Sequence, residues 1–325
     1  MDAIILAAGF ATRLRPLSFV RPKVLVPICG RPLLDIMLRQ LSVSGFKHVH
    51  INTHHLPEQL ETFLQKQKYP LDIKIYHEEK ILGTGGGIYR MASDVVDKKA
   101  QILVLNGDIL AGLDLEFLCE YHSKSGGAVT MVMVDSSTFN NVLVDADFSI
   151  LAFGEKAKRL VDGVSGSRLM TFTGIHVVNR EIIAKYSPRR DFFSIIDTYE
   201  NAISAGEKVK AVFLPRMPWQ EVGSIAGYWE AHMRIKEKPD IFSPWLTEVK
   251  FPIVDVTATI HRGTQMEGIV CIGKSCRIDS GVRLRDVIIW DWVHIKKDAE
   301  LTNVIVCDHC TVENSAKDTI LLNAR

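Results

Sequence analysis

The sequence has no long hydrophobic run, little net charge and few cysteines, and each of these absences removes a class of protein. Among its 325 residues, no apolar segment reaches the roughly 18 residues that a membrane-spanning helix needs. The first residues, Met-Asp-Ala-Ile-Ile-Leu, lack the basic segment of a signal peptide. We therefore expect a cytoplasmic protein that does not associate with membranes.

The 39 Lys and Arg residues nearly balance the 38 Asp and Glu residues, which leaves a formal net charge of +1. Such a chain has no general attraction for nucleic acid, so we do not expect nucleic acid as a partner. An anionic ligand would have to be held by a local group of charges. The six cysteines are too sparse for a disulfide framework, and we expect reduced thiols.

Up to about residue 238, short apolar runs of β type alternate with amphipathic segments. This alternation predicts an α/β domain with a doubly wound, mainly parallel sheet that helices cover on both faces. Helical spacing is clearest in residues 32–45 and 224–238. The predicted strands are 3–8, 48–53, 72–76, 101–105, 128–134, 169–178 and 209–214.

Residues 236–252 are rich in Pro, Lys and Glu, and Pro239, Pro244 and Pro252 would interrupt a helix or strand there. We therefore predict a first domain at 1–238, a linker at 239–252 and a second domain at 253–325.

Large apolar residues recur every six positions in the second domain, with two slips of one residue. They are Ile260, Met266, Ile272, Ile278, Leu284, then Ile289, Ile295, Leu301, then Val306 and Val312. Four positions after each stands a small or β-branched residue: Thr264, Val270, Cys276, Val282, Val293, Ala299, Ile305, Cys310 and Ala316. A hexapeptide repeat of this kind predicts a parallel β-helix, in which each large residue stacks on the corresponding residue of the next coil.

The first turn after a strand, Leu6 to Leu17, has the composition of an anion cradle. Ala7, Ala8 and Gly9 are small enough for backbone N–H groups to approach a phosphate, and Thr12 and Arg13 add a hydroxyl and a guanidinium. The turn matches neither the ATPase phosphate loop nor the spaced glycines of a dinucleotide-binding turn. The pair Pro22-Lys23 adds a second cation shortly afterwards.

Together these residues resemble the opening signature of the sugar-1-phosphate nucleotidylyltransferases, and the resemblance is closest to mannose-1-phosphate guanylyltransferase-like and N-acetylmuramic acid 1-phosphate uridylyltransferase-like members. It implies a Rossmann-like first domain and a left-handed β-helix. The further segments that carry it are 25–28, 30–33, 83–87, 106–108, 155–156, 173–175 and 219–223.

The resemblance implies that a nucleoside triphosphate and a sugar 1-phosphate are the ligands and that pyrophosphate is released. Arg13 would hold the triphosphate, Lys23 the α-phosphate, and Asp108 a catalytic Mg²⁺. Glu221 stands where the family usually has an aspartate as the second metal ligand. Asp108 could alternatively cap a helix, and Glu221 could be an ordinary surface residue at a helix start.

The resemblance places the glycine-rich turn, with Gly83, Thr84 and Gly85, around the base and ribose. Glu78 could accept hydrogen bonds from the N1–H and amino group of guanine, which uracil and thymine lack. The charged residues beside it leave open a solvated loop without a ligand. On this basis GTP is the favoured nucleotide.

For the sugar, the resemblance implies that Glu155 holds a hydroxyl, Lys156 holds the phosphate, and Gly174 lets the backbone approach the ring. Ala157 replaces a frequent proline, and the segment Phe139-Asn140-Asn141-Val142 stands where a tyrosine-glycine pair is common. Mannose 1-phosphate is the favoured acceptor. Assembly of the chain as a homo-oligomer through the β-helix is a further expectation.

Two other functions stay open. Ala11 in place of a usual glycine, together with Glu221, is compatible with a subunit that binds nucleotide sugar without turnover. The hexapeptide repeat also occurs in acyltransferases, for which His294 and His309 are the candidate bases.

Three further features have structural interpretations. The adjacent His54 and His55 point to opposite sides of an extended chain, which disfavours a shared metal. Cys307-Asp308-His309-Cys310 looks like half a zinc site, but the hexad makes packing thiols the preferred interpretation. Trp290 and Trp292 belong either to an oligomer contact or to the core.

Overall fold

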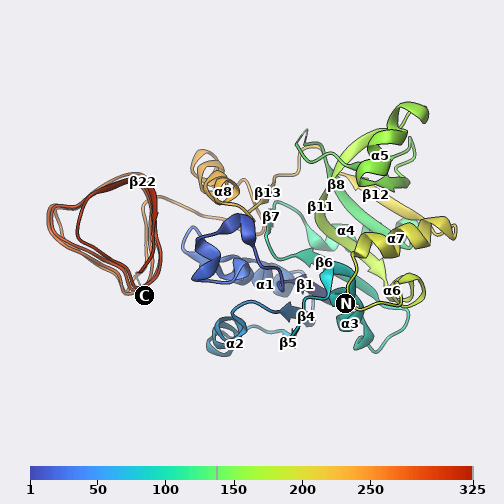
Figure 1. Ribbon diagram of the computed structural model, residues 1–325, viewed down its shortest axis with the longest axis horizontal. Coiled ribbons are helices and arrows are strands. Elements are labelled where there is room, and N and C mark those ends of the chain that lie inside the picture. The colour runs from blue at the N-terminus through green and yellow to red at the C-terminus, as the bar shows by residue number, and fades with distance from the viewer. Residues whose placement is uncertain (137, 324–325) are drawn as a thin grey trace. The chain divides into compact units, whose positions relative to one another are not determined.

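A computed structural model describes residues 1–136 and 138–323 (Figure 1). The chain forms two compact units, and each is made of two segments. The first unit contains residues 1–10 and 37–219, and the second contains residues 11–36 and 220–325. Within the described residues, no helix has the length and apolar character needed to cross a membrane.

The first unit is built on a mixed sheet whose order is β10-β9-β11-β6-β1-β4-β5, with β8 and β12 continuing beyond β11. The segment β6-β1-β4-β5 is parallel, while β11 runs antiparallel to β6, β8 and β9. The strands are β1 (Asp2–Leu6), β4 (His48–Thr53), β5 (Asp72–His77), β6 (Gln101–Asn106), β8 (Val129–Val134), β9 (Val142–Val144), β10 (Ile150–Phe153), β11 (Arg168–Asn179) and β12 (Val209–Phe213). The predicted α/β fold is confirmed, with an antiparallel strand at its centre.

Helices follow several of the strands, and side-chain caps mark where some of them begin. Asp114 accepts hydrogen bonds from the backbone N–H groups of Glu116 and Phe117, and Ser194 accepts one from Ile196. The helices are α1 (Leu33–Val43), α2 (Pro57–Lys66), α3 (Gly83–Ser93), α4 (Leu115–Ser125), α5 (Gly154–Leu160), α6 (Arg180–Tyr186), α7 (Ile195–Ser204) and α8 (Ile225–Glu237). The short strand β7 (Ile109–Ala111) follows β6, and the short strand β13 (Trp219–Glu221) precedes α8.

The register of the parallel strands defines one edge of the sheet. Leu6 lies opposite Asn52 on one side and opposite Asn106 on the other. Three strand ends therefore lie side by side, and the turns that follow them begin at the same level. In an open α/β sheet, this carboxyl edge is where ligands bind.

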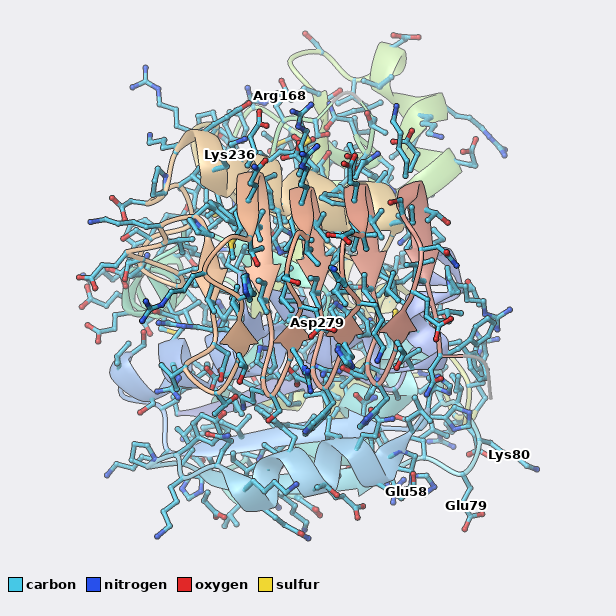
Figure 2. The ribbon with its side chains drawn as sticks, turned by 90° about the vertical axis from the view of Figure 1, so that its left-hand side faces the viewer. Glu58, Glu79, Lys80, Arg168, Lys236 and Asp279 are labelled. Atoms are coloured by element: carbon cyan, nitrogen blue, oxygen red, sulfur yellow. The ribbon has the colours of Figure 1, made fainter. Side chains whose placement is uncertain are left out.

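The second unit contains the predicted parallel β-helix, whose coils enclose a three-sided core in Figure 1. One sheet contains β14 (Ile253–Val254), β16 (Gln265–Ile272), β18 (Arg283–Ile289), β20 (Glu300–Val306) and β22 (Ala316–Leu321). The other contains β15 (Thr259–Ile260), β17 (Arg277–Ile278), β19 (His294–Ile295) and β21 (Thr311–Val312). Figure 2 looks onto these stacked coils, with Asp279 near the middle of the face.

The slips in the six-residue period have a structural cause. Glu267 pairs with Arg285 and Val270 with Val287, so two residues in one coil correspond to Asp286 alone in the next. Asp286 takes a left-handed conformation with φ 52°, which lets the shorter turn round the corner.

The second slip repeats this corner at Asn303, whose φ is 54°. One inward position was misassigned because of it. The side chain in the coil core is that of Val304, whereas Ile305 lies outside this core although it is also buried.

The rest of the second unit packs on the outer side of the coils. It begins with three short 3₁₀ turns, η1 (Thr12–Leu14), η2 (Leu17–Phe19) and η3 (Lys23–Leu25), and a small hairpin of β2 (Pro27–Ile28) and β3 (Arg31–Pro32). Helix α8 packs against β2 and β16. The residues after α8 bury Phe242, Trp245 and Leu246, so this segment contributes to the packing of the unit.

Candidate functional site

The turn after β1 is fixed by an amide at the neighbouring strand end. The backbone N–H of Ala7 donates to Oδ1 of Asn52 at 2.7 Å, and Nδ2 of Asn52 donates to Oε1 of Glu78 at 2.8 Å. Because the N–H of Ala7 is used inside the protein, donors for a ligand must come from further along the turn, where Gly9 is exposed. Asn52 was not identified from the sequence as part of the site. Its position as a polar residue near the end of a predicted parallel strand could have indicated such a role.

Glu78 is buried, unlike its charged neighbours. The residue is 1% exposed, and its Oε2 accepts a hydrogen bond from the backbone N–H of Leu82 at 2.9 Å. Glu79 and Lys80 lie at the periphery of Figure 2, pointing outward. Glu78 thus ties the end of β5 to the start of α3, and a base could reach only the lone pairs that these bonds leave.

The glycines of α3 are required by a close approach of residues 191–195. A Cβ on Gly83 would lie 2.5 Å from the carbonyl oxygen of Phe193, and one on Gly85 would overlap the Phe193 ring. The N–H of Gly85 donates to that carbonyl at 2.9 Å, and Thr84 Oγ1 accepts the N–H of Ile195 at 3.0 Å. The turn is therefore rigid, and Phe193 is a second residue that sequence reasoning missed, since no local pattern identifies a contact over such a separation.

A cavity of about 840 Å³ lies along the outer side of α3 and contains none of the predicted ligand-binding residues. Its lining combines four cations with two acids and the exposed ring of Tyr89. The cations are Arg90, Lys185, Arg189 and Arg190.

The Asn106-Gly107-Asp108 turn packs against Gly174, the glycine of β11. Gly174 has φ +81°, and a Cβ there would lie 2.5 Å from Nδ2 of Asn106. The N–H of Gly107 donates to the carbonyl of Leu6 at 3.0 Å. This places Asp108 at the carboxyl edge of the sheet, as predicted, and shows that the glycine at 174 is needed by the protein's own packing. Asn106 belongs to a segment that carries the resemblance, but its contact with Gly174 was not predicted.

In the second unit, Arg13 and Glu221 form an ion pair. Nη1 of Arg13 lies 3.3 Å from Oε2 of Glu221, and Nη2 contacts Oε1. The Arg13 side chain is 62% exposed and that of Glu221 is 17% exposed. Two residues predicted to bind different parts of the substrate complex therefore bind each other in this structure. Glu221 is held by the tight start of α8, where Ser224 caps the helix and Gly227 approaches the Glu221 carbonyl.

Ala11 stands where the backbone is left-handed, with φ 48° and ψ 47°. This is the conformation that glycine adopts without strain, so the replacement of the usual glycine has a direct structural cost. The carbonyl of Ala11 accepts the N–H of Leu14 at 3.0 Å and the hydroxyl of Ser18 at 3.0 Å. Thr12 and Arg13 open η1 from this residue, and Lys23 opens η3.

The predicted sugar-binding pair lies on the short helix α5. Glu155, 71% exposed, forms an ion pair with Nζ of Lys158 at 2.7 Å, and the hydrogen bond from Lys158 lowers the pKa of the Glu155 carboxyl. Lys156 is exposed, while Ala157 is fully buried against Leu143. The two cations on either side of Ala157 are therefore presented to solvent.

Three of the histidines considered in the sequence, His54, His294 and His309, have local partners. His54 Nδ1 lies 2.7 Å from the carbonyl of Glu78. His294 pairs with Asp279, and His309 stacks on Trp292 with ring centroids 4.9 Å apart. All six cysteines are buried thiols, and in residues 1–136 and 138–323 no three His, Cys, Asp or Glu side chains gather as a metal site.

Comparison with known proteins finds two family models along the chain. Residues 2–238 match the nucleotidyl transferase family, and residues 249–320 match the GMPPB C-terminal domain. A similar curated protein is mannose-1-phosphate guanylyltransferase 1 of Arabidopsis thaliana, 30% identical over 98% of this chain and 89% of its own length.

Two other curated proteins show how broad the similarity is. The mannose-1-phosphate guanylyltransferase of Mycobacterium tuberculosis is 27% identical over 91% of this chain and 81% of its own. The UTP–glucose-1-phosphate uridylyltransferase of a Synechocystis species is 26% identical over 87% of this chain and 76% of its own. Among solved structures, HddC from Yersinia pseudotuberculosis superposes with a TM-score of 0.58 at 21% identity, covering 72% of this chain and 99% of that one. This structural likeness supports the fold.

Proposed function

Since this chain belongs to the nucleotidyl transferase family, we propose that it transfers the guanylyl group of GTP to mannose 1-phosphate, giving GDP-mannose and pyrophosphate. The observation that carries the choice of substrates is the match to a mannose-1-phosphate guanylyltransferase over 98% of the chain, which includes both the sheet domain and the β-helix. The uridylyltransferase relative makes UTP and glucose 1-phosphate the first competitors to test.

The chemistry requires two polyanions to meet, so electrostatic stabilisation and positioning account for most of the rate. In the proposed mechanism, a phosphate oxygen of mannose 1-phosphate attacks the α-phosphorus of GTP, and the bond to pyrophosphate breaks. Lys23 neutralises charge that accumulates on the α-phosphate, and Arg13 binds the departing pyrophosphate. A guanidinium suits this second task because its fork of donors matches phosphate oxygens.

The ion pair between Arg13 and Glu221 gives this mechanism an ordered first step. In the free protein each side chain neutralises the other. Binding of a triphosphate to Arg13 would separate the pair and leave the Glu221 carboxylate available. The pair thereby holds both groups in place without a ligand.

The residues fit a Mg²⁺ ion by the chemistry of their donors. Asp108 and Glu221 would hold it, because magnesium prefers one or two carboxylates completed by substrate phosphate oxygens. When bound, such an ion supplies positive charge to the phosphates. The Glu221 backbone precedes the tight start of α8, where Gly227 closely approaches its carbonyl.

For the two substrates, we assign Gly9, Thr12, Gly83, Thr84 and Gly85 to the nucleotide, with Ala7 and Ala8 shaping the turn. Glu78 would accept from guanine while it remains bonded to Asn52 and Leu82. Glu155 and Lys156 would hold the sugar hydroxyl and phosphate, and Gly174 would line the sugar subsite.

The experiment that tests this proposal measures pyrophosphate release with each of five nucleoside triphosphates against a panel of sugar 1-phosphates. We expect the highest kcat/KM for GTP with mannose 1-phosphate, and a loss of at least 100-fold in kcat for Lys23→Ala. Lys297→Ala is the matched control, because that lysine is 71% exposed and lies in the β-helix. Unchanged turnover in Lys23→Ala would refute the mechanism.

A second candidate is a subunit that binds GDP-mannose without turnover. Two observations favour it: the strained conformation of Ala11 and the engagement of Arg13 by Glu221. Saturable binding of GDP-mannose combined with no pyrophosphate release from any substrate pair would select this candidate.

A further inference from the structure

Arg21 is a buried guanidinium in the loop that leads to Lys23. Its side chain is 12% exposed, and two of its nitrogens bond Asp308: Nε to Oδ2 at 2.6 Å and Nη2 to Oδ1 at 2.6 Å. Nη2 also lies 2.7 Å from Oδ2 of Asp291. Burial alone would lower the pKa of Arg21, but the hydrogen bonds and charges of Asp308 and Asp291 raise it, so the guanidinium stays charged.

The two acidic partners come from neighbouring coils of the β-helix and are themselves linked. The backbone N–H of Asp291 donates to Oδ1 of Asp308 at 2.9 Å. The Arg21 guanidinium carbon lies 5.1 Å from the ring centre of Trp290, which is fully buried. The contact is thus a bidentate ion pair stacked on an aromatic ring, a geometry that lysine cannot reproduce.

Trp290 also connects to the far end of the same loop. Its Nε1–H donates to the hydroxyl of Tyr228 at 3.2 Å, and that hydroxyl donates to the carbonyl of Pro27 at 2.7 Å. All of these groups are buried, so each bond is shielded from water and has well-defined geometry.

Two further hydrogen bonds fix Cys29, which lies two residues after Pro27. The backbone N–H of Cys29 donates to Nε2 of His232 at 3.1 Å, and Nδ1 of His232 donates to the carbonyl of Tyr228 at 2.9 Å. The loop is therefore held at residue 21 by the β-helix and at residues 27 and 29 by α8. Lys23 lies between these two anchors, at the start of η3.

A buried charge cluster is a poor device for stability alone, because an apolar cluster of the same volume often stabilises a fold as well or better. What a bidentate pair adds is a fixed position. We propose that Arg21, held by Asp291, Asp308 and Trp290 of the β-helix, is a positioning residue that sets the place of Lys23 for its reaction. This inference rests on the proposed function, and it makes the β-helix part of the framework of the phosphate-binding loop.

The test compares Arg21→Lys and Asp308→Asn with a matched control on the same coils. Arg283→Lys is that control, because Arg283 pairs with Glu300 at 2.9 Å with both side chains well exposed. In the full-length protein, we expect kcat to fall at least tenfold in the two test variants, with the KM for the sugar 1-phosphate changed less than twofold. The control should keep wild-type kcat. A lower melting temperature with kcat within twofold of wild type would overturn the proposal.

Trp290→Phe serves if Arg21→Lys does not fold, because it keeps an aromatic ring beneath Arg21 while removing the bond to Tyr228. We expect it to fold and to lose kcat at least threefold, and wild-type kcat in this variant would count against the proposal.

A second readout is independent of activity. Trypsin does not cut before Pro22, so cleavage between residues 21 and 29 occurs only after Lys23. We expect this cleavage, followed by mass spectrometry under native conditions, to accelerate at least tenfold in Arg21→Lys and Asp308→Asn but not in Arg283→Lys. Equal cleavage rates would show that the loop is not anchored by Arg21. If the wild-type protein releases no pyrophosphate with any substrate, the proposed function fails, and the cleavage rates alone then decide whether the anchor exists.

Discussion

Arg13 and Glu221, separated by 208 positions in the sequence, form an ion pair in which Nη1 lies 3.3 Å from Oε2. Both were expected to act on the substrate complex, one on the triphosphate and one on a metal ion. Because the Arg13 side chain is 62% exposed, the pair contributes little to stability, on the order of 0–1 kcal/mol, and Arg13 can exchange Glu221 for a bound phosphate. Glu221 could therefore have either of two roles, as a ligand of Mg²⁺ or only as the partner of Arg13.

Substitution Glu221→Gln distinguishes these roles. If Glu221 binds Mg²⁺, the variant should need at least tenfold more Mg²⁺ for half-maximal rate, because a neutral amide is a weaker ligand than a carboxylate. If Glu221 only pairs with Arg13, the Mg²⁺ requirement should stay constant and the KM for the nucleotide should fall, because Arg13 has lost its competing partner. We expect the first result, measured by titrating Mg²⁺ at saturating substrates. Glu300→Gln, which disrupts an exposed pair with Arg283, is the control.

Ala11 provides a prediction about stability. A left-handed conformation costs a residue with a side chain roughly 1–2 kcal/mol, whereas glycine loses roughly 0.5–1 kcal/mol more conformational entropy on folding. Ala11→Gly should therefore leave the free energy of unfolding unchanged or raise it by up to about 1.5 kcal/mol. Ala157→Gly, in the interior of α5, should lower it by about 1 kcal/mol. Urea unfolding of the three proteins checks both, and an equal loss in the two variants would contradict the assigned conformation.

The glycine-rich turn should tolerate no side chain. Gly85→Ala would place a methyl group against the Phe193 ring, and such overpacking costs on the order of 1–3 kcal/mol. We expect a lower melting temperature and a raised KM for the nucleotide. Gly163→Ala is the control, because an added Cβ meets open space there.

The double variant Gly85→Ala with Phe193→Ala should lose less stability than the sum of the losses in the two single variants, because the smaller side chain at 193 relieves the clash. Absence of any coupling between the two substitutions would mean that these residues do not touch.

How far the sequence could predict this molecule depended on the range of the interactions. The strand at 101–105 was predicted to within one residue because its apolar run is local. The six-residue repeat could be recognised because each coil has the same pattern as its neighbour. The contacts of Asn52, Asn106 and Phe193 could not be predicted, because each joins the residue to a glycine or a carboxylate that is distant in the chain.

The same reason explains why the anchor at Arg21 could not be foreseen. In the sequence, Arg21 stands in a mainly apolar stretch and looks like an ordinary surface arginine. Only the fold shows that Asp291 and Asp308 stand one coil apart on the surface that meets it. The chain's division was also hidden, since residues 11–36 join residues 220–325 in one unit without any local signal.

Stability should fall between neutral and mildly acidic pH because of His232. Burial lowers the pKa of His232 to about 4, below its ordinary value of 6.5, because both ring nitrogens lie inside the protein. The unfolded chain therefore takes up a proton between pH 6.5 and pH 4 that the folded chain does not, which favours unfolding as the pH falls. Above pH 6.5 both states are neutral at this residue and the effect vanishes. We expect the urea midpoint to decrease from pH 7 to pH 5.

His232→Gln should show a smaller decrease over that interval, because glutamine does not titrate. Its amide oxygen could still accept the Cys29 N–H, so the variant preserves one bond of the wild type. A variant with the same pH profile as the wild type would indicate that other groups dominate. His176 is the most direct of these, since burial lowers its pKa to about 3, and the double variant with His176→Phe should flatten the profile further.

The neighbouring lysines of α5 allow a sharp test of the sugar subsite. Lys156 and Lys158 are both exposed cations on one short helix, but Lys158 is engaged by Glu155, whereas the resemblance assigns the sugar phosphate to Lys156. Lys156→Ala should raise the KM for mannose 1-phosphate at least tenfold and leave the KM for GTP within twofold, because the lost charge would act only on the sugar phosphate. Lys158→Ala should change neither constant by more than twofold, although it removes the same charge from the same helix. Since both side chains are exposed, both variants should keep the wild-type melting temperature. Equal effects of the two substitutions would mean that α5 acts through its general charge and that Lys156 has no specific contact with the sugar phosphate.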